Sequence, residues 1–217
     1  MYLGSVIDND DVHFESLLDD DDVFLGTKND KKVIEEWIKH NYFFTGKLFI
    51  SDDLDVHCSG EVRIKNKSIE SLTNGLFRWG MVSKVFCCTN CENLKSLEGA
   101  PEKVGRSFNC SGCKSLISLE GAPEEVGGNF LCYQCKSLID LNGAPKKAGG
   151  FNCGECENLK SLNYSYGEIC GYFACDDCNN LKTLEGAPEK IKGSFSCFNC
   201  KNLTITDSDR KKYKIEN

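Results

Sequence analysis

The sequence has no long apolar run. No stretch of about 18 uncharged apolar residues occurs in the 217 residues, and the first residues lack the basic start and apolar core of a signal peptide. A membrane span and classical secretion are therefore not expected. We predict a cytoplasmic protein with no membrane partner.

Familiar catalytic and nucleotide-binding patterns are also missing. No G-x-S-x-G elbow, P-loop, H-E-x-x-H or paired-carboxylate pattern occurs. The glycine pairs in the second half belong to a repeat and fit turns better than a phosphate cradle. We therefore predict that the protein is not an enzyme and uses no cofactor.

Positive charge is scarce where nucleic-acid binding would need it. The formal net charge is −7, and nine acidic residues against Lys28 alone fall within residues 1–30, so the remainder is nearly neutral. Without a basic stripe, no nucleic-acid partner is expected. Three interpretations of an acidic leader over residues 1–28 stay open: a solvated segment, an arm that binds a partner, or a mimic of nucleic-acid charge.

A repeat of about 22 residues fills the second half of the chain. Each copy reads F-x-C-x-x-C-x-x-L-x-x-L-x-G-A-P-x-x-V-G-G-x, and the copies begin at Phe86, Phe108, Phe130, Phe151, Phe173 and Phe195. The Gly-Ala-Pro and the paired glycines exclude a helix there. Residues two apart on a strand share a face, so each Phe and the first Cys after it point the same way. The repeat predicts a mainly β fold, a parallel β solenoid over residues 86–205.

At this point a family resemblance can be stated. The motifs SLEGAPEKVGRSFNC and SLEGAPEEVGGNFLC resemble repeats of bacteriophage and bacterial leucine-rich repeat proteins, over roughly residues 30–205. The chain departs from that pattern because many such repeats carry Asn at the second Cys, and because the acidic leader looks like an addition. The resemblance implies a leucine-rich repeat solenoid, encoded by a phage, in the cytoplasm of the host cell. It suggests an inhibitor of a host or defence protein.

The ends of a solenoid need covers, because the terminal coils otherwise expose apolar side chains and strand edges. Residues 29–43 have helical spacing of apolar residues, with Asn29 or Asp30 suited to the N-cap. Residues 48–64 alternate around a Ser59-Gly60 turn, which predicts a hairpin. We expect a small α/β cap with a first degenerate coil over residues 29–85, with Trp79 packed in it. Residues 206–217 form a polar tail that either caps the far end or frays.

Six C-x-x-C pairs account for twelve of the 15 cysteines: Cys88/Cys91, Cys110/Cys113, Cys132/Cys135, Cys153/Cys156, Cys175/Cys178 and Cys197/Cys200. A structural ladder of buried thiols, each S–H donating to a carbonyl of a neighbouring coil, explains all six pairs. A zinc site explains two pairs at a time, and a redox pair needs a helix N-terminus or a cation beside the thiolate. The ladder is favoured, and no metal ligand is assigned.

The residues that alternate with Phe and Cys point outward and are mostly small and polar. Large exposed residues in such columns tend to anchor interfaces, and an irregular loop in a regular solenoid is a second candidate. In one coil Tyr164 and Tyr166 replace the Gly-Ala-Pro. The predicted partner-binding face comprises Leu131, Tyr133, Tyr164, Tyr166, Asp176 and Phe198. We expect a non-enzymatic scaffold that binds a protein. The alternative is a metal-binding or thiol-redox protein that uses the C-x-x-C pairs.

Overall fold

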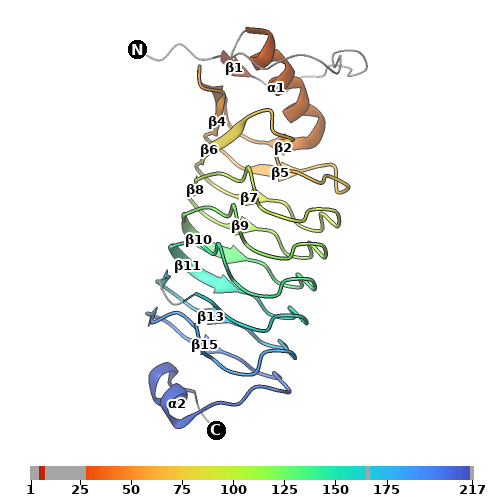
Figure 1. Cartoon of the computed structure of the whole chain (residues 1–217). Helices are drawn as coiled ribbons and strands as arrows, with labels where there is room; N and C mark the ends of the chain where they lie inside the picture. Colours follow the sequence, from red (N-terminus) through yellow and green to blue (C-terminus); the bar gives the residue numbers. More distant parts are fainter. Residues whose placement is uncertain (1–4, 8–27, 165–166, 216–217) are drawn as a thin grey trace.

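The chain folds into a parallel β solenoid whose coils are stacked between an N-terminal helix and a C-terminal helix (Figure 1). The computed structural model describes residues 5–7, 28–164 and 167–215. The predicted mainly β solenoid with a small α/β N-terminal cap is confirmed. Most of the acidic leader lies outside the described residues, so the expectations for it are not tested.

The described residues form fifteen strands and two helices. They are β1 Ser5–Ile7, α1 Lys28–Asn41, β2 Tyr42–Phe44, β3 Leu48–Ile50, β4 Asp55–Cys58, β5 Val62–Ile64, β6 Arg78–Val82, β7 Phe86–Cys87, β8 Lys103–Val104, β9 Phe108–Asn109, β10 Glu125–Leu131, β11 Lys147–Asn152, β12 Glu168–Ile169, β13 Phe173–Ala174, β14 Lys190–Ile191, β15 Phe195–Ser196 and α2 Asp207–Tyr213. No helix in these ranges is long and apolar enough to cross a membrane.

Each coil of the repeat contributes two strand segments, and each segment pairs in parallel with its equivalent in the next coil. One column runs β6–β8–β10 and another runs β5–β7–β9–β10, while β10 and β11 are long enough to belong to both. The register places Phe130 opposite Phe108 on one side and Phe151 on the other. Equivalent residues therefore lie directly over one another, as the repeat predicts.

A stack of phenylalanine rings forms the axis of the core. Successive rings from Phe86 to Phe195 have centroids 5.2 to 5.5 Å apart and planes within 2 to 13° of parallel. The first five rings are fully buried. The paired cysteines of the coils before the last, and the two leucines that follow each of these pairs, are buried beside them. The predicted inward orientation of Phe and the first Cys is thus confirmed.

The N-terminal cap has the predicted helix, with shifted bounds. The helix α1 begins at Lys28, so Asn29 and Asp30 lie inside it, and the predicted N-cap is wrong. It ends at Asn41 because the next residues pair with β5 as strand β2. Ile34 and Ile38 of α1 are fully buried against the first coil.

The predicted hairpin exists, but its turn lies elsewhere. Strands β3 and β4 pair antiparallel around residues 51–54. The Ser59-Gly60 turn instead leads from β4 to β5, which pairs with β2 and β7 rather than with β4. Trp79 packs edge-on against Tyr42 and Phe86, which confirms its expected place in the cap.

The far end is covered in part by the tail, which forms helix α2. Thr206 and Asp209 make a reciprocal capping box, and Lys214 ends the helix in a left-handed conformation. The ring of Tyr213 stacks on Phe195 with centroids 4.4 Å apart. The tail therefore caps the last ring of the stack.

Replacing Phe130 by Ala should lower the free energy of unfolding by about 3 to 5 kcal/mol, because it removes one buried ring and leaves a cavity between two others. Phe198→Ala is the matched control. Its ring is 75% exposed, so the change should stay within about 0.5 kcal/mol. Urea unfolding followed by circular dichroism measures both, and equal effects would contradict the stacked core.

Candidate functional site: the strand face and the C-terminal end

The C-x-x-C spacing arises from a corner that recurs in every coil. The residue before the second Cys has a positive φ of 52 to 74° in all six copies: Asn90, Gly112, Gln134, Glu155, Asp177 and Asn199. This left-handed residue turns the chain after the strand, so the second thiol points back into the core. The spacing is therefore explained by backbone geometry.

The thiols form hydrogen bonds that link the coils in both directions. The first Cys of a pair donates to a backbone carbonyl of the next coil, as from Cys110 to Leu131 at 3.4 Å. The second Cys donates to the carbonyl of the first Cys in the preceding coil, as from Cys113 to Cys88 at 3.0 Å and from Cys135 to Cys110 at 3.3 Å. The same two bonds recur through later coils. The predicted thiol ladder is present.

Burial keeps these thiols protonated, as a donor must be. Desolvation raises the pKa of the Cys110, Cys132 and Cys153 thiols well above the ordinary value. A zinc ligand or a redox nucleophile is a thiolate. Within the described residues, no group of three or more His, Cys, Asp or Glu side chains is placed to hold a metal ion.

Three cysteines depart from the buried pattern. Cys170 is exposed, since it occupies a surface position that is Gly105 in an earlier coil. Cys197 and Cys200 are half-buried because no further coil covers them. Burial, together with the neighbouring Cys200 and Asp176, raises the pKa of Cys197 to about 11.

On the strand face, Tyr133 is held in a defined position. Its hydroxyl donates to a carboxylate oxygen of Glu155, and the amide of Gln134 donates to the other oxygen at 2.8 Å. The bond from Tyr133 lowers the pKa of Glu155 and raises that of Tyr133. The ring lies across Gly154, where an added Cβ would meet the ring at 3.4 Å. This is an ordinary van der Waals distance, so the ring packs against the backbone of the next coil.

The structure brings most of the predicted face together. Leu131 and Tyr133 are neighbours on one strand face, both half-buried. Asp176 and Phe198 lie further along the same column, where Asp176 accepts from the Phe198 N–H at 2.6 Å and from the Ser196 hydroxyl at 2.5 Å. Phe198 is the most exposed large apolar side chain in the described part of the chain.

Tyr164 is not part of this face, and its assignment there is wrong. It is 4% exposed and packs on Phe151 with ring centroids 5.0 Å apart, while its hydroxyl donates to the carbonyl of Pro145 at 2.5 Å. Without Gly-Ala-Pro in this coil, the tyrosine ring fills the interior corner. Tyr166 lies outside the described residues.

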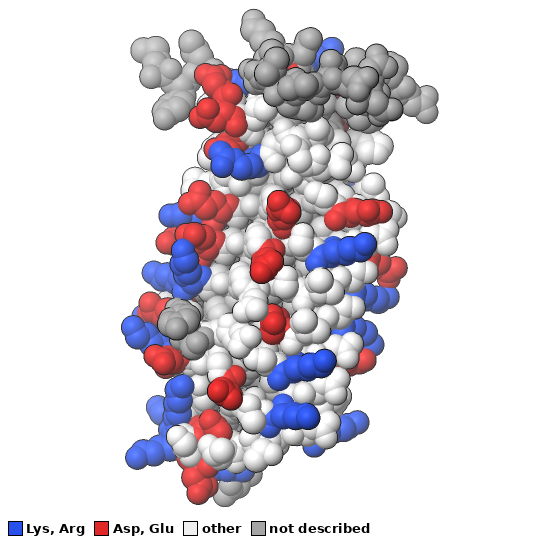
Figure 2. All heavy atoms as spheres, viewed as in Figure 1, with Lys and Arg blue, Asp and Glu red and all other residues white. Residues whose placement is uncertain are grey.

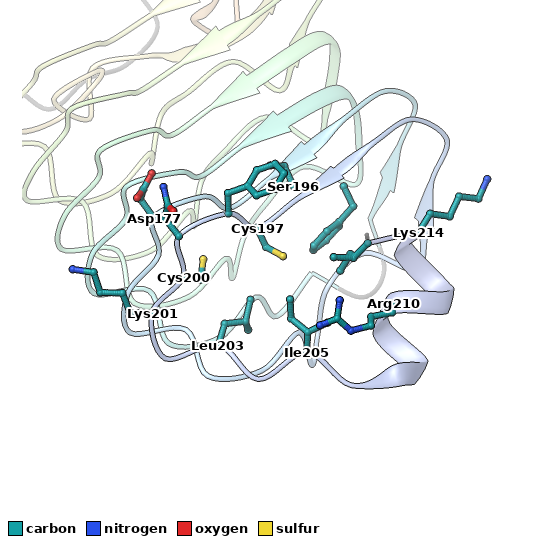
Figure 3. A pocket seen from close by; sticks show the side chains of 13 residues that line it. Asp177, Ser196, Cys197, Cys200, Lys201, Leu203, Ile205, Arg210 and Lys214 are labelled. Carbon is teal, nitrogen blue, oxygen red and sulfur yellow. The ribbon is translucent and has the colours of Figure 1, made fainter. Parts of the chain in front are cut away.

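A pocket at the C-terminal end was not expected from the sequence. It has a volume of about 930 Å³ and lies between the last coil and α2 (Figure 3). Phe198, Cys197 and Leu203 from the last coil line it, and Arg210 reaches into it from α2. The truncated last repeat was the available signal, because a coil without a successor leaves its interior open.

Outside this end, charge on the solenoid is balanced between coils. Acidic and basic side chains form neighbouring columns over successive coils (Figure 2). Several pair across one coil step, as Lys114 with Glu92 at 2.6 Å and Lys136 with Glu157 at 2.7 Å. Solvent screens exposed pairs of this kind, so each contributes little to stability.

Alkylation with iodoacetamide should distinguish the thiol ladder from the metal and redox alternatives. At pH 8, the exposed Cys170 should react first, and Cys197 should react slowly because only the thiolate reacts. The rate at Cys197 should rise about tenfold per pH unit until pH approaches about 11. Peptide mass spectrometry assigns the sites.

After denaturation without reductant all 15 thiols should titrate. A shortfall, or bound zinc, would count against the ladder.

Comparisons with known proteins found no match for this chain. No protein-family model matches it, and no curated protein and no solved structure matches it either.

Proposed function

We propose that this protein is a non-enzymatic scaffold that binds a protein partner through its strand face. The face comprises Leu131, Tyr133, Asp176 and Phe198. The observation that carries the proposal is the fixed position of Tyr133, whose hydroxyl is held by Glu155 and whose ring lies over Gly154. An aromatic side chain that is ordered before binding loses little conformational entropy in an interface.

The backbone beneath this cluster supports the same proposal. Gln134 and Glu155 both have positive φ, of 59° and 52°. Neither residue type favours the left-handed region, whereas the equivalent corners carry Asn, Asp or Gly. Strained positions of this kind tend to be kept where they serve a function. Here the two side chains orient Tyr133.

The finer parts of the proposal rest on the sequence resemblance. Similarity to leucine-rich repeats of phage and bacterial proteins supports a phage-encoded protein in the host-cell cytoplasm, and an inhibitor of a host or defence protein. That step is an analogy of fold and motif. A metal or redox function is less favoured, because the paired thiols already serve as hydrogen-bond donors to carbonyls.

Affinity capture from bacterial lysate should test the face. The wild-type chain is compared with the double variant Tyr133→Ser, Phe198→Ser, and retained proteins are identified by mass spectrometry. The matched control is Ile117→Ser, Ile139→Ser, which removes two apolar residues that are 54% and 47% exposed elsewhere on the coils.

A protein retained by the wild type and the control, and lost with the face variant, supports the proposal. The purified partner should then bind the face variant about 30-fold more weakly or worse, as expected when an anchor worth about 2 kcal/mol is removed. Equal retention by all three chains would show that binding uses another surface, and no retained protein would leave the scaffold function without support.

A further inference from the structure

The last coil exposes a strand edge whose hydrogen-bonding pattern is known from the coils before it. In the preceding coil, the N–H groups of Phe173, Cys175 and Asp177 donate to carbonyls of the last coil. The equivalent groups in the last coil are the N–H groups of Phe195, Cys197 and Asn199. Within the described residues, none of these three has an acceptor. The edge therefore offers three donors in a row, at the spacing of a strand.

The hydrogen bonds of the thiols at this edge are also incomplete within the described residues. In the preceding coil the Cys175 thiol donates to the carbonyl of Ser196 in the last coil. The Cys200 thiol of the last coil donates in turn to the carbonyl of Cys175. The Cys197 thiol has no acceptor in the described part of the chain, and the Cys197 carbonyl receives no thiol. Beside them is the apolar pocket of about 930 Å³. An added extended segment would supply both the missing hydrogen bonds and apolar cover.

The charged residues around this pocket favour an acidic segment. Lys201, Lys214 and Asp177 lie at the rim of the pocket, where the two lysine side chains extend outward, and Arg210 is the cation that enters it (Figure 3). Arg210 is half-buried and extends toward Ile205 across the pocket, and it makes no ion pair with any described residue (Figure 3). A half-buried guanidinium without a carboxylate favours an acidic ligand. A second copy docked through the same end would bring these cations together, so that occupant is disfavoured.

The chain itself contains a segment of the required kind. Between Ile7 and Lys28 the sequence interleaves acidic and apolar residues. In an extended conformation Val12 and Phe14 would lie on one face, and Asp11 and Glu15 on the other. This alternation matches an edge that offers apolar cover on one side and cations on the other.

The same copy cannot supply this segment to its own C-terminal end. Ile7 and Lys28 both belong to the N-terminal cap, so the 20 residues between them must go out and return, which limits their reach to about 34 Å. The strand β15 lies seven strand steps from β2, also about 34 Å at about 4.8 Å per step. No residues would remain to lie along the edge.

We propose that the C-terminal end of the solenoid binds the acidic segment of residues 8–27 from a second copy, as an extended strand added beside β15. The main-chain donors of β15 provide affinity, the pocket takes an apolar side chain, and Arg210 with Lys201 selects the acidic sequence. Such a contact joins unlike surfaces, so it builds head-to-tail chains or a closed ring. The pocket shares Phe198 with the strand face, so the test below uses variants at Lys201 and Arg210, which lie outside that face.

Sedimentation velocity of the full-length chain over a range of concentrations tests the proposal. The wild type should form assemblies larger than a monomer, and association should weaken as salt is raised from about 20 mM to about 500 mM. The variant Lys201→Glu, Arg210→Glu should associate at least about tenfold more weakly. The control Lys160→Glu, Lys182→Glu makes the same change in net charge on exposed residues elsewhere and should associate like the wild type.

Two further variants separate a specific contact from loss of folding. Adding Asp11→Lys, Glu15→Lys to the Lys201→Glu, Arg210→Glu variant should restore association, because the charges are exchanged across the contact. Cys197→Pro removes an edge N–H that has no acceptor among the described residues, so it should block association without lowering the melting temperature greatly. A wild type that stays monomeric overturns the proposal. So does association that survives the changes at Lys201, Arg210 and Cys197, or that is lost equally in the lysine control.

Discussion

The spacing between parallel coils governs the rest of this structure. Backbone hydrogen bonds hold equivalent residues of adjacent coils about 4.8 Å apart, so any inward side chain must pack against its own equivalent. Flat phenylalanine rings meet that condition by stacking, and small thiols meet it by bonding to a neighbouring carbonyl. The same spacing leaves no room at the turns, where a Cβ on Gly127 would lie 2.3 Å from the Gly105 carbonyl oxygen.

Because the regular positions are so constrained, the residues that differ from the consensus are the ones that distinguish one coil from another. Two tyrosines illustrate the two possible outcomes. Tyr164 fills an interior corner that Gly-Ala-Pro occupies in other coils, so this change from the repeat serves packing. Tyr133 stands on the outer face, where the scaffold needs only a small residue, and two strained corner residues hold it in place. The second kind of departure has no packing reason, and for that reason it supports a binding role.

The two ends of the solenoid are covered to different extents. At the N-terminus, α1 and the strands β2 to β4 bury the first coil against Ile34, Ile38 and Tyr42. At the C-terminus, α2 covers the last phenylalanine through Tyr213 but leaves the Cys197 side of the coil open. Among the described residues, this edge therefore keeps main-chain donors without acceptors beside a pocket that Arg210 enters, whereas the N-terminal coil is covered.

The sequence by itself determined the repeating part of this protein. A period of about 22 residues with Phe, Cys and Leu at fixed positions predicts stacked extended coils, so the solenoid and its inward residues follow from the spacing. The spacing favoured a thiol ladder over a metal or redox pair, and the hydrogen bonds of the folded chain show the ladder. The irregular parts were decided by tertiary structure. The turn of the β3–β4 hairpin, the burial of Tyr164 and the fixing of Tyr133 by Glu155 depend on which neighbour lies one coil away and how much space it leaves. The C-terminal pocket likewise exists only because α2 packs against one side of the last coil, a choice that no local pattern specifies.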